Sequence, residues 1–224
     1  MEKNIKIKPI KETTFRLLLV GDGDLILCKK SRRYEQSDVW KQNHDKGATM
    51  PEKYLRKNKW EEFITSITWE HPIDFHDDDI GLYTEDEWKY YMENNRPCIL
   101  SYAFLKNFKE AFISLGFKES TNKNGTDIER SLTFSRRINP IIFAKATPKS
   151  MLVPNNTQSR TNVVCNQNIF SGWECEITMS VPDKIFPAET IINIVQTAGK
   201  YIGIGAARKS GYGRYHIEKA SLLR

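Results

Sequence analysis

Apolar residues recur at helical spacing in two segments of the chain. In residues 101–116 they fall on one helix face, with Ser101 as the expected N-cap and Gly116 as the expected end. In residues 187–199 a second stripe follows Pro187, a residue type that suits the start of a helix. The members of the stripes are Phe104, Leu105, Phe108, Ala111, Phe112 and Leu115, then Ile191, Ile194, Val195 and Ala198. The pattern predicts two amphipathic helices.

A period of two marks the strands. Residues 173–181 alternate strictly, with apolar residues such as Cys175 on one face and polar residues such as Glu176 on the other. This alternation is typical of a half-buried antiparallel strand. Residues 14–20 are rich in leucine and β-branched residues and predict a strand that is buried on both faces. Further strands are expected at residues 5–10, 25–28, 138–145, 151–154 and 215–219.

Periodicity is poor in residues 34–96, a polar stretch that also concentrates acidic side chains. We interpret it as an insertion with local helix and a few strands, inside one domain that spans residues 1–224. Its tryptophans are expected to be packing anchors. The element order matches a split β-α-β topology, which predicts an α+β, ferredoxin-like antiparallel sheet with helices on one face and a long insertion. The other face would be open, as in RNA-recognition folds.

Composition excludes some classes of protein. The chain has 224 residues, 39% of them hydrophobic, and a mean hydropathy of −0.55. No apolar run approaches the roughly 20 residues that a membrane span needs, and the first residues lack a signal core. A cytoplasmic protein without a membrane partner is therefore expected. The four cysteines lie far apart with no paired spacing, so we expect neither a zinc site nor any other metal or cofactor.

The balance of charge favours a polyanionic partner. The net charge is +6 and the sequence pI is about 9.0. Basic residues cluster at 29–33, 53–59 and 136–137, and again close to the carboxyl end. This distribution indicates a basic working surface beside an acidic inserted segment.

A glycine-rich basic stretch follows the second predicted helix. Its glycines allow positive φ and close approach of another chain, its cations suit phosphates, and its tyrosines offer flat faces to bases. These residues are Gly203, Gly205, Gly211 and Gly213, Arg208, Lys209 and Arg214, and Tyr212 and Tyr215. Together they suit a sugar-phosphate strand better than a small apolar ligand.

Three segments carry a resemblance to a known family. Residues 17–28, residues 97–109 and residues 199–215 resemble the RAMP superfamily, whose members build the backbone of CRISPR effector complexes. The most specific match is the Gly211–Tyr215 motif, Gly-Tyr-Gly-Arg-Tyr, which enters the last predicted strand. The chain is most similar to uncharacterised phage proteins of this superfamily. The resemblance covers about two-thirds of the chain and misses residues 34–96.

The resemblance implies a ferredoxin-like core of the RRM type that binds single-stranded RNA or DNA, with subunits assembled side by side as a homo-oligomer. A phage-encoded protein would act in the host cytoplasm. Phosphate contacts are expected from Arg208, Lys209 and Arg214, and base stacking from Tyr212 or Tyr215. The residues that would extend this track are Lys29, Lys30, Arg32 and Arg33.

Two alternatives stay open. Some relatives cleave RNA with a histidine, so the chain could be a metal-independent endoribonuclease that uses His216 or His44, although we expect His216 to be an ordinary strand residue and name no catalytic residue. The chain could instead be a phage protein that binds and inhibits a host defence complex through residues 34–96. The preference between RNA and DNA depends on 2′-hydroxyl contacts that a sequence does not reveal.

Overall fold

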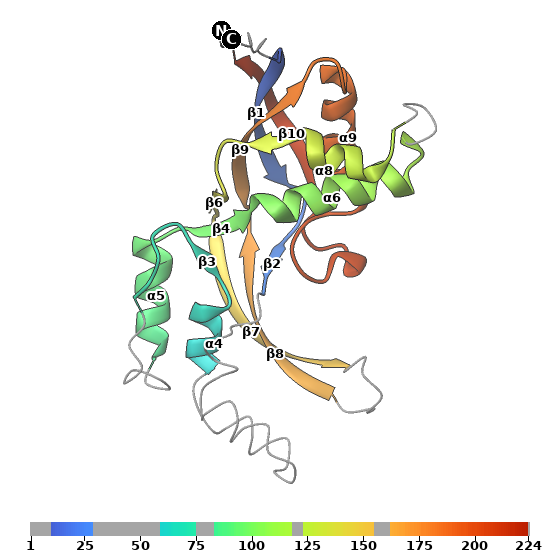
Figure 1. Cartoon of the computed structure of the whole chain (residues 1–224). Helices are drawn as coiled ribbons and strands as arrows, with labels where there is room; N and C mark the ends of the chain where they lie inside the picture. The colour runs from blue at the N-terminus through green and yellow to red at the C-terminus, as the bar shows by residue number, and fades with distance from the viewer. Residues whose placement is uncertain (1–9, 29–58, 75–82, 118–122, 155–161, 224) are drawn as a thin grey trace, which may run out of the picture.

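The computed structural model describes residues 10–28, 59–74, 83–117, 123–154 and 162–223 (Figure 1). The strands are β1 (Glu12–Gly21), β2 (Leu25–Leu27), β3 (Thr68–Trp69), β4 (Pro97–Leu100), β5 (Thr133–Phe134), β6 (Ile138–Ile142), β7 (Lys145–Pro154), β8 (Asn162–Ser171), β9 (Glu174–Pro182) and β10 (Tyr215–Leu223). The helices are α4 (Lys59–Thr65), α5 (Glu85–Asn94), α6 (Ser101–Ser114), α8 (Gly125–Ser131), α9 (Ala188–Tyr201) and the short 3-10 helix η2 (Arg208–Ser210). The expected strand at residues 5–10 lies almost wholly outside these ranges.

The main sheet is antiparallel, with strand order β10-β1-β9-β6-β4-β3 and β5 paired to β9. In β1 the side chains of Phe15, Leu17 and Leu19 are buried, whereas Arg16 between them is exposed. The prediction that this strand is buried on both faces is therefore wrong, because alternate residues of β1 point away from the core. The predicted alternation of β9 is confirmed.

Helices cover one face of the main sheet (Figure 1). The predicted helices appear as α6 and α9, whose apolar stripes join the core beneath. Ser101 is the first residue of α6 and not its N-cap, since its hydroxyl donates to the carbonyl of Arg136. These features confirm the predicted α+β class, an antiparallel ferredoxin-like sheet with its helices on one side.

A second antiparallel sheet has the strand order β2-β8-β7. The single strand expected at residues 138–145 is in fact two strands, because the chain leaves the main sheet after Ile142 and enters the second sheet at Lys145. Phe143 lies between them and meets Phe170 of β8 edge-on, with ring centroids 5.0 Å apart. An aromatic contact is therefore present at the point where the chain changes sheets.

The described part of residues 34–96 comprises α4, β3 and α5. Thr68 of β3 pairs with Cys98 of β4, so this segment adds an edge strand to the main sheet. Two of its tryptophans are buried: Trp69 Nε1 donates to the carbonyl of Ile64 over 2.9 Å, and Trp88 Nε1 to Asn168 Oδ1 over 2.9 Å. These two are packing anchors, as expected. The assignment of a single domain with an insertion stays a prediction.

Candidate nucleic-acid interface

The glycine-rich loop connects α9 to β10 and folds back on itself. Ile204 N–H donates to the carbonyl of Gly213 over 2.9 Å, and Gly213 N–H donates to the carbonyl of Asp24 over 2.8 Å. Ala206 N–H donates to the carbonyl of Ile26 in β2, also over 2.9 Å. The loop is therefore a built structure, attached by its backbone to β2 and to the β1–β2 connection.

Three of the four loop glycines serve this internal packing. A Cβ at Gly213 would lie 1.8 Å from the carbonyl oxygen of Ile204, and one at Gly205 would lie 2.5 Å from that of Ile26. A Cβ at Gly203 would lie 2.8 Å from the carbonyl oxygen of Tyr212. The expectation that these glycines admit another chain is wrong, because the protein's own backbone occupies the space. Gly211 differs: its φ is 88°, and no described residue lies within 4 Å of an added Cβ.

The loop tyrosines have different positions. Tyr215 is fully buried, and its hydroxyl donates to Asn107 Oδ1 over 2.7 Å. Burial raises the pKa of this hydroxyl well above its usual value. The expectation that Tyr215 stacks on a base is wrong, since the ring packs in the core against Trp173. Tyr212 is partly exposed.

The loop cations also differ from one another. Lys209 is exposed and makes no ion pair with a residue in the described part of the chain. Arg208 Nη1 lies 2.7 Å from Glu110 Oε2 of α6. Arg214 is partly buried, and its Nη1 lacks a hydrogen-bond partner among the described residues. Lys209 is thus the loop cation with its charge fully available.

The contacts with α6 define the side on which the loop lies. Besides the Arg208–Glu110 pair, Asn107 Nδ2 donates to the carbonyl of Gly203 over 2.8 Å. The loop therefore lies at the end of the main sheet and against α6. The prediction that it forms one track with the open sheet face is wrong. Lys29, Lys30, Arg32 and Arg33, which were expected to extend that track, lie outside the described residues.

A second cationic patch, which the predicted site omitted, lies at the start of α6. Arg136 and Arg137 are exposed in the turn between β5 and β6, and Ser101 N–H donates to the carbonyl of Arg137 over 3.0 Å. Nearby, Lys106 Nζ lies 4.6 Å from the centroid of the Tyr102 ring, which is 59% exposed. The adjacent arginines are visible in the sequence, but only the fold brings them to the helix.

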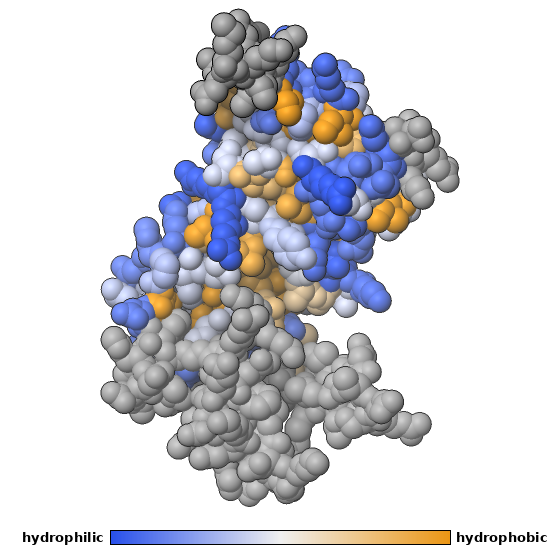
Figure 2. All heavy atoms as spheres, in the orientation of Figure 1, coloured by the Kyte–Doolittle hydropathy of each residue, from blue (hydrophilic) through white to orange (hydrophobic). Residues whose placement is uncertain are grey.

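One stripe of α6 connects the two patches. Tyr102, Lys106 and Glu110 are four residues apart, so they lie on the same side of the helix. All three are exposed, and Glu110 holds Arg208 of the loop. Figure 2 shows hydrophilic side chains among apolar ones on this face of the molecule. We call this surface, from Arg136 to Lys209, the α6 face.

The open face of the main sheet has a different electrostatic character. His216 Nδ1 lies 2.6 Å from Asp22 Oδ1, and its Nε2 lies 3.3 Å from Glu218 Oε2. The hydrogen bond to Asp22 raises the pKa of the imidazole. Because both ring nitrogens face carboxylates, neither is free to take a proton from a substrate, and this geometry gives no support to His216 as a general base. His44 lies outside the described residues.

No group of three or more His, Cys, Asp or Glu that could hold a metal occurs within the described ranges. Residues 76–79, a histidine followed by three aspartates, lie outside those ranges. No described helix is long and apolar enough to cross a membrane. Burial raises the pKa of the Cys98 thiol to about 12 and also raises that of Cys175.

No protein-family model and no curated protein matches the chain. Among solved structures it is similar to a chain of the cryo-EM structure of the Type III-B Cmr-beta bound to cognate target RNA, with a TM-score of 0.51 and 12% identity. The match covers 96% of this chain, which spans 61% of the length of that neighbour. At this identity the likeness shows the fold, and it agrees with the predicted α+β, ferredoxin-like architecture.

Proposed function

We propose that this chain binds single-stranded nucleic acid, RNA in the first place, along the α6 face. The observation that carries the proposal is the unpaired positive charge at both ends of one exposed helix stripe. Arg136 and Arg137 lie at its start and Lys209 at its end, and none makes an ion pair with a residue in the described ranges. Between them, the exposed ring of Tyr102 offers a stacking surface.

The length of this helix stripe suits a short stretch of a nucleic-acid strand. From Tyr102 to Glu110 the helix rises about 12 Å, which spans a few nucleotides. Phosphates would contact the cations at either end. A base would stack on the ring of Tyr102, next to the ammonium group of Lys106. The structural neighbour is a chain of a complex bound to its target RNA, which supports RNA over DNA as the ligand to test first.

Assembly of several copies along one strand is the finer form of the proposal. Each copy would neutralise a few phosphates and release their counterions, and neighbouring copies would gain from their high local concentration on the strand. The mass of complexes with oligonucleotides of increasing length tests this: the expected result is a stepwise increase in bound copies. A phage source and a host-protein partner stay predictions.

Binding of labelled RNA across a salt series tests the central proposal. In a variant with Arg136, Arg137 and Lys209 replaced by alanine, the salt slope should fall by about 2, because each lost phosphate contact of a single strand contributes about 0.7. The charge-matched control replaces Lys11, Lys184 and Lys219, which are also exposed but lie away from the α6 face. Equal slopes for the two variants would contradict the proposed site.

A further inference from the structure

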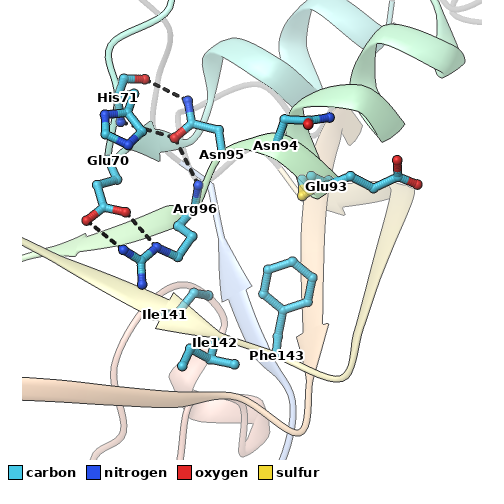
Figure 3. A pocket seen from close by; sticks show the side chains of 10 residues that line it. Glu70, His71, Glu93, Asn94, Asn95, Arg96, Ile141, Ile142 and Phe143 are labelled. Atoms are coloured by element: carbon cyan, nitrogen blue, oxygen red, sulfur yellow. Dashed lines mark hydrogen bonds and ion pairs between the residues drawn. The ribbon is translucent and has the colours of Figure 1, made fainter.

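A pocket of about 270 Å³ lies between the end of α5, the start of β4 and the β6–β7 connection (Figure 3). It is separate from the α6 face. Its volume is near the lower end of the range of small-molecule sites, about 300–1,000 Å³, so it suits one small ring system and not a length of chain. Its floor is apolar, formed by Phe143 and by Ile142, which is 57% exposed.

The polar wall is held in place by hydrogen bonds. Arg96 Nε and Nη2 donate to the two carboxylate oxygens of Glu70 over 2.6 and 3.0 Å. Asn95 Oδ1 accepts from the backbone N–H groups of His71 and Arg96 over 3.1 and 2.9 Å. Arg96 Nη1 makes no hydrogen bond with a described residue, and Figure 3 shows this third nitrogen pointing toward Ile142. The guanidinium is thus oriented in advance, with one donor facing the pocket.

The aromatic side of the pocket is fixed as well. Phe143 is held edge-on by Phe170 and, in Figure 3, its ring stands across the pocket from Arg96. A planar ligand that lies against the phenyl ring would present one of its edges to the guanidinium. Aromatic rings are surfaces on which unpaired bases stack.

The charge of the wall selects the kind of ligand. The lining carries two carboxylates, Glu70 and Glu93, and one guanidinium, which Glu70 already pairs, so the pocket does not favour a phosphate. The last turn of α5 adds carbonyl groups without helical partners, at the negative end of the helix dipole. Acceptors therefore outnumber donors, and a ligand with N–H donors and at least one acceptor fits best.

We propose that this pocket binds an unpaired nucleobase that carries an exocyclic amine: adenine, cytosine or guanine. The amine donates to the acceptors of the wall, and a ring nitrogen or carbonyl accepts from Arg96. The base comes either from a free nucleotide or from the bound strand, and only the second source rests on the proposed function.

Titration with uncharged nucleosides, followed by saturation-transfer NMR, tests the inference without a contribution from phosphate. Guanosine, adenosine or cytidine should bind at least about fivefold more tightly than uridine, the value of one additional hydrogen bond. Ile142→Arg should weaken this binding at least about tenfold, since the new side chain fills the pocket and reaches its carboxylates. Ile10→Arg is the matched control, because Ile10 is 71% exposed and lies two residues before the start of β1.

Equal binding of all four nucleosides would overturn the inference, as would unchanged binding by Ile142→Arg. Stronger binding of arginine amide than of any nucleoside would overturn it too, in favour of a site for a basic peptide side chain. An oligonucleotide with one abasic position separates the two sources: weaker binding than the intact strand identifies a base of the strand. Nucleoside binding that persists while the chain fails to bind RNA would leave a free-nucleotide site and refute the proposed function alone.

Discussion

The open face of the main sheet and the α6 face carry similar charged residues in different arrangements. On the open face, Arg16 lies 3.8 Å from Glu176 and His216 lies between two carboxylates. On the α6 face, Arg136, Arg137 and Lys209 make no ion pair with a described residue. The comparison teaches that a count of cations says little about binding. What matters is whether a carboxylate of the same chain already neutralises them.

Substitution at Gly213 should have the largest effect, because this residue holds together the loop that supplies Lys209. An added methyl group would lie 1.8 Å from the carbonyl oxygen of Ile204, at a φ of 70°. We expect Gly213→Ala to lower the free energy of unfolding by more than about 4 kcal/mol, measured by urea denaturation.

Gly211→Ala is the matched control for that variant. Gly211 also has positive φ, at 88°, but open space around it. Its substitution should cost about 1–2 kcal/mol, the price of the backbone conformation alone. Equal losses for the two variants would show that the loop is not packed as described.

A pair of tyrosine substitutions should separate stability from binding. Tyr215→Phe leaves the buried Asn107 Oδ1 without its donor and should lower the free energy of unfolding by about 1–3 kcal/mol, with RNA affinity unchanged at equal folded fraction. Tyr102→Ala should do the reverse, with a loss of about 1–3 kcal/mol in RNA binding and little change in stability. Equal RNA affinity of Tyr102→Ala and the unmodified chain would contradict the α6 face as the stacking surface.

Removal of the carboxylate that pairs with Arg208 should increase the positive charge available to RNA on the α6 face. In Glu110→Gln, Arg208 loses its carboxylate partner and becomes available to a phosphate. RNA affinity should rise a few-fold at low salt, and the salt slope should steepen by about 0.7. Glu176→Gln makes the equivalent change beside Arg16 on the open face, and there the slope should not change.

The smallest effect concerns pH. Because the pKa of His216 is raised in the folded protein, its pairs stabilise the fold fully below about pH 6.5, the unfolded value, and the benefit is lost as the pH rises through the folded pKa. His216→Gln should therefore reduce the free energy of unfolding more at about pH 5.5 than at about pH 8.5. A difference independent of pH would show that the imidazole is not held by Asp22 in solution.

Much of the framework could be predicted from the sequence. The periods of α6, α9 and β9 come directly from side chains that the core must bury, so local pattern and tertiary structure agree. The burial of β1 is harder to predict because leucines occupy both faces of the strand. Within the leucine-rich segment, Arg16 indicates which face is exposed. The change of sheet after Ile142 has no local signal, since the apolar run continues through Phe143 and Ala144 without a glycine or proline.

The candidate site was less predictable for a physical reason. A glycine beside open space and one packed on the chain's own backbone look the same in a sequence. Gly213 is packed on Ile204, whereas Gly211 has open space among the described residues. Tyr212 and Tyr215 likewise look the same in the sequence. Only the pairing of β10 with β1 places Tyr215 in the core. Among the described residues, Arg136 has no carboxylate partner, and this is a property of the assembled surface that the sequence does not reveal.

One buried amide has a consequence for motion. Asn107 accepts a hydrogen bond from the Tyr215 hydroxyl and donates one to the carbonyl of Gly203. A single side chain of α6 therefore connects the glycine loop to the terminal strand. Backbone amides of the loop and of β10 should therefore exchange with solvent deuterium as one cooperative unit. A ligand that binds Lys209 would therefore slow amide exchange in β10, at residues that it does not contact.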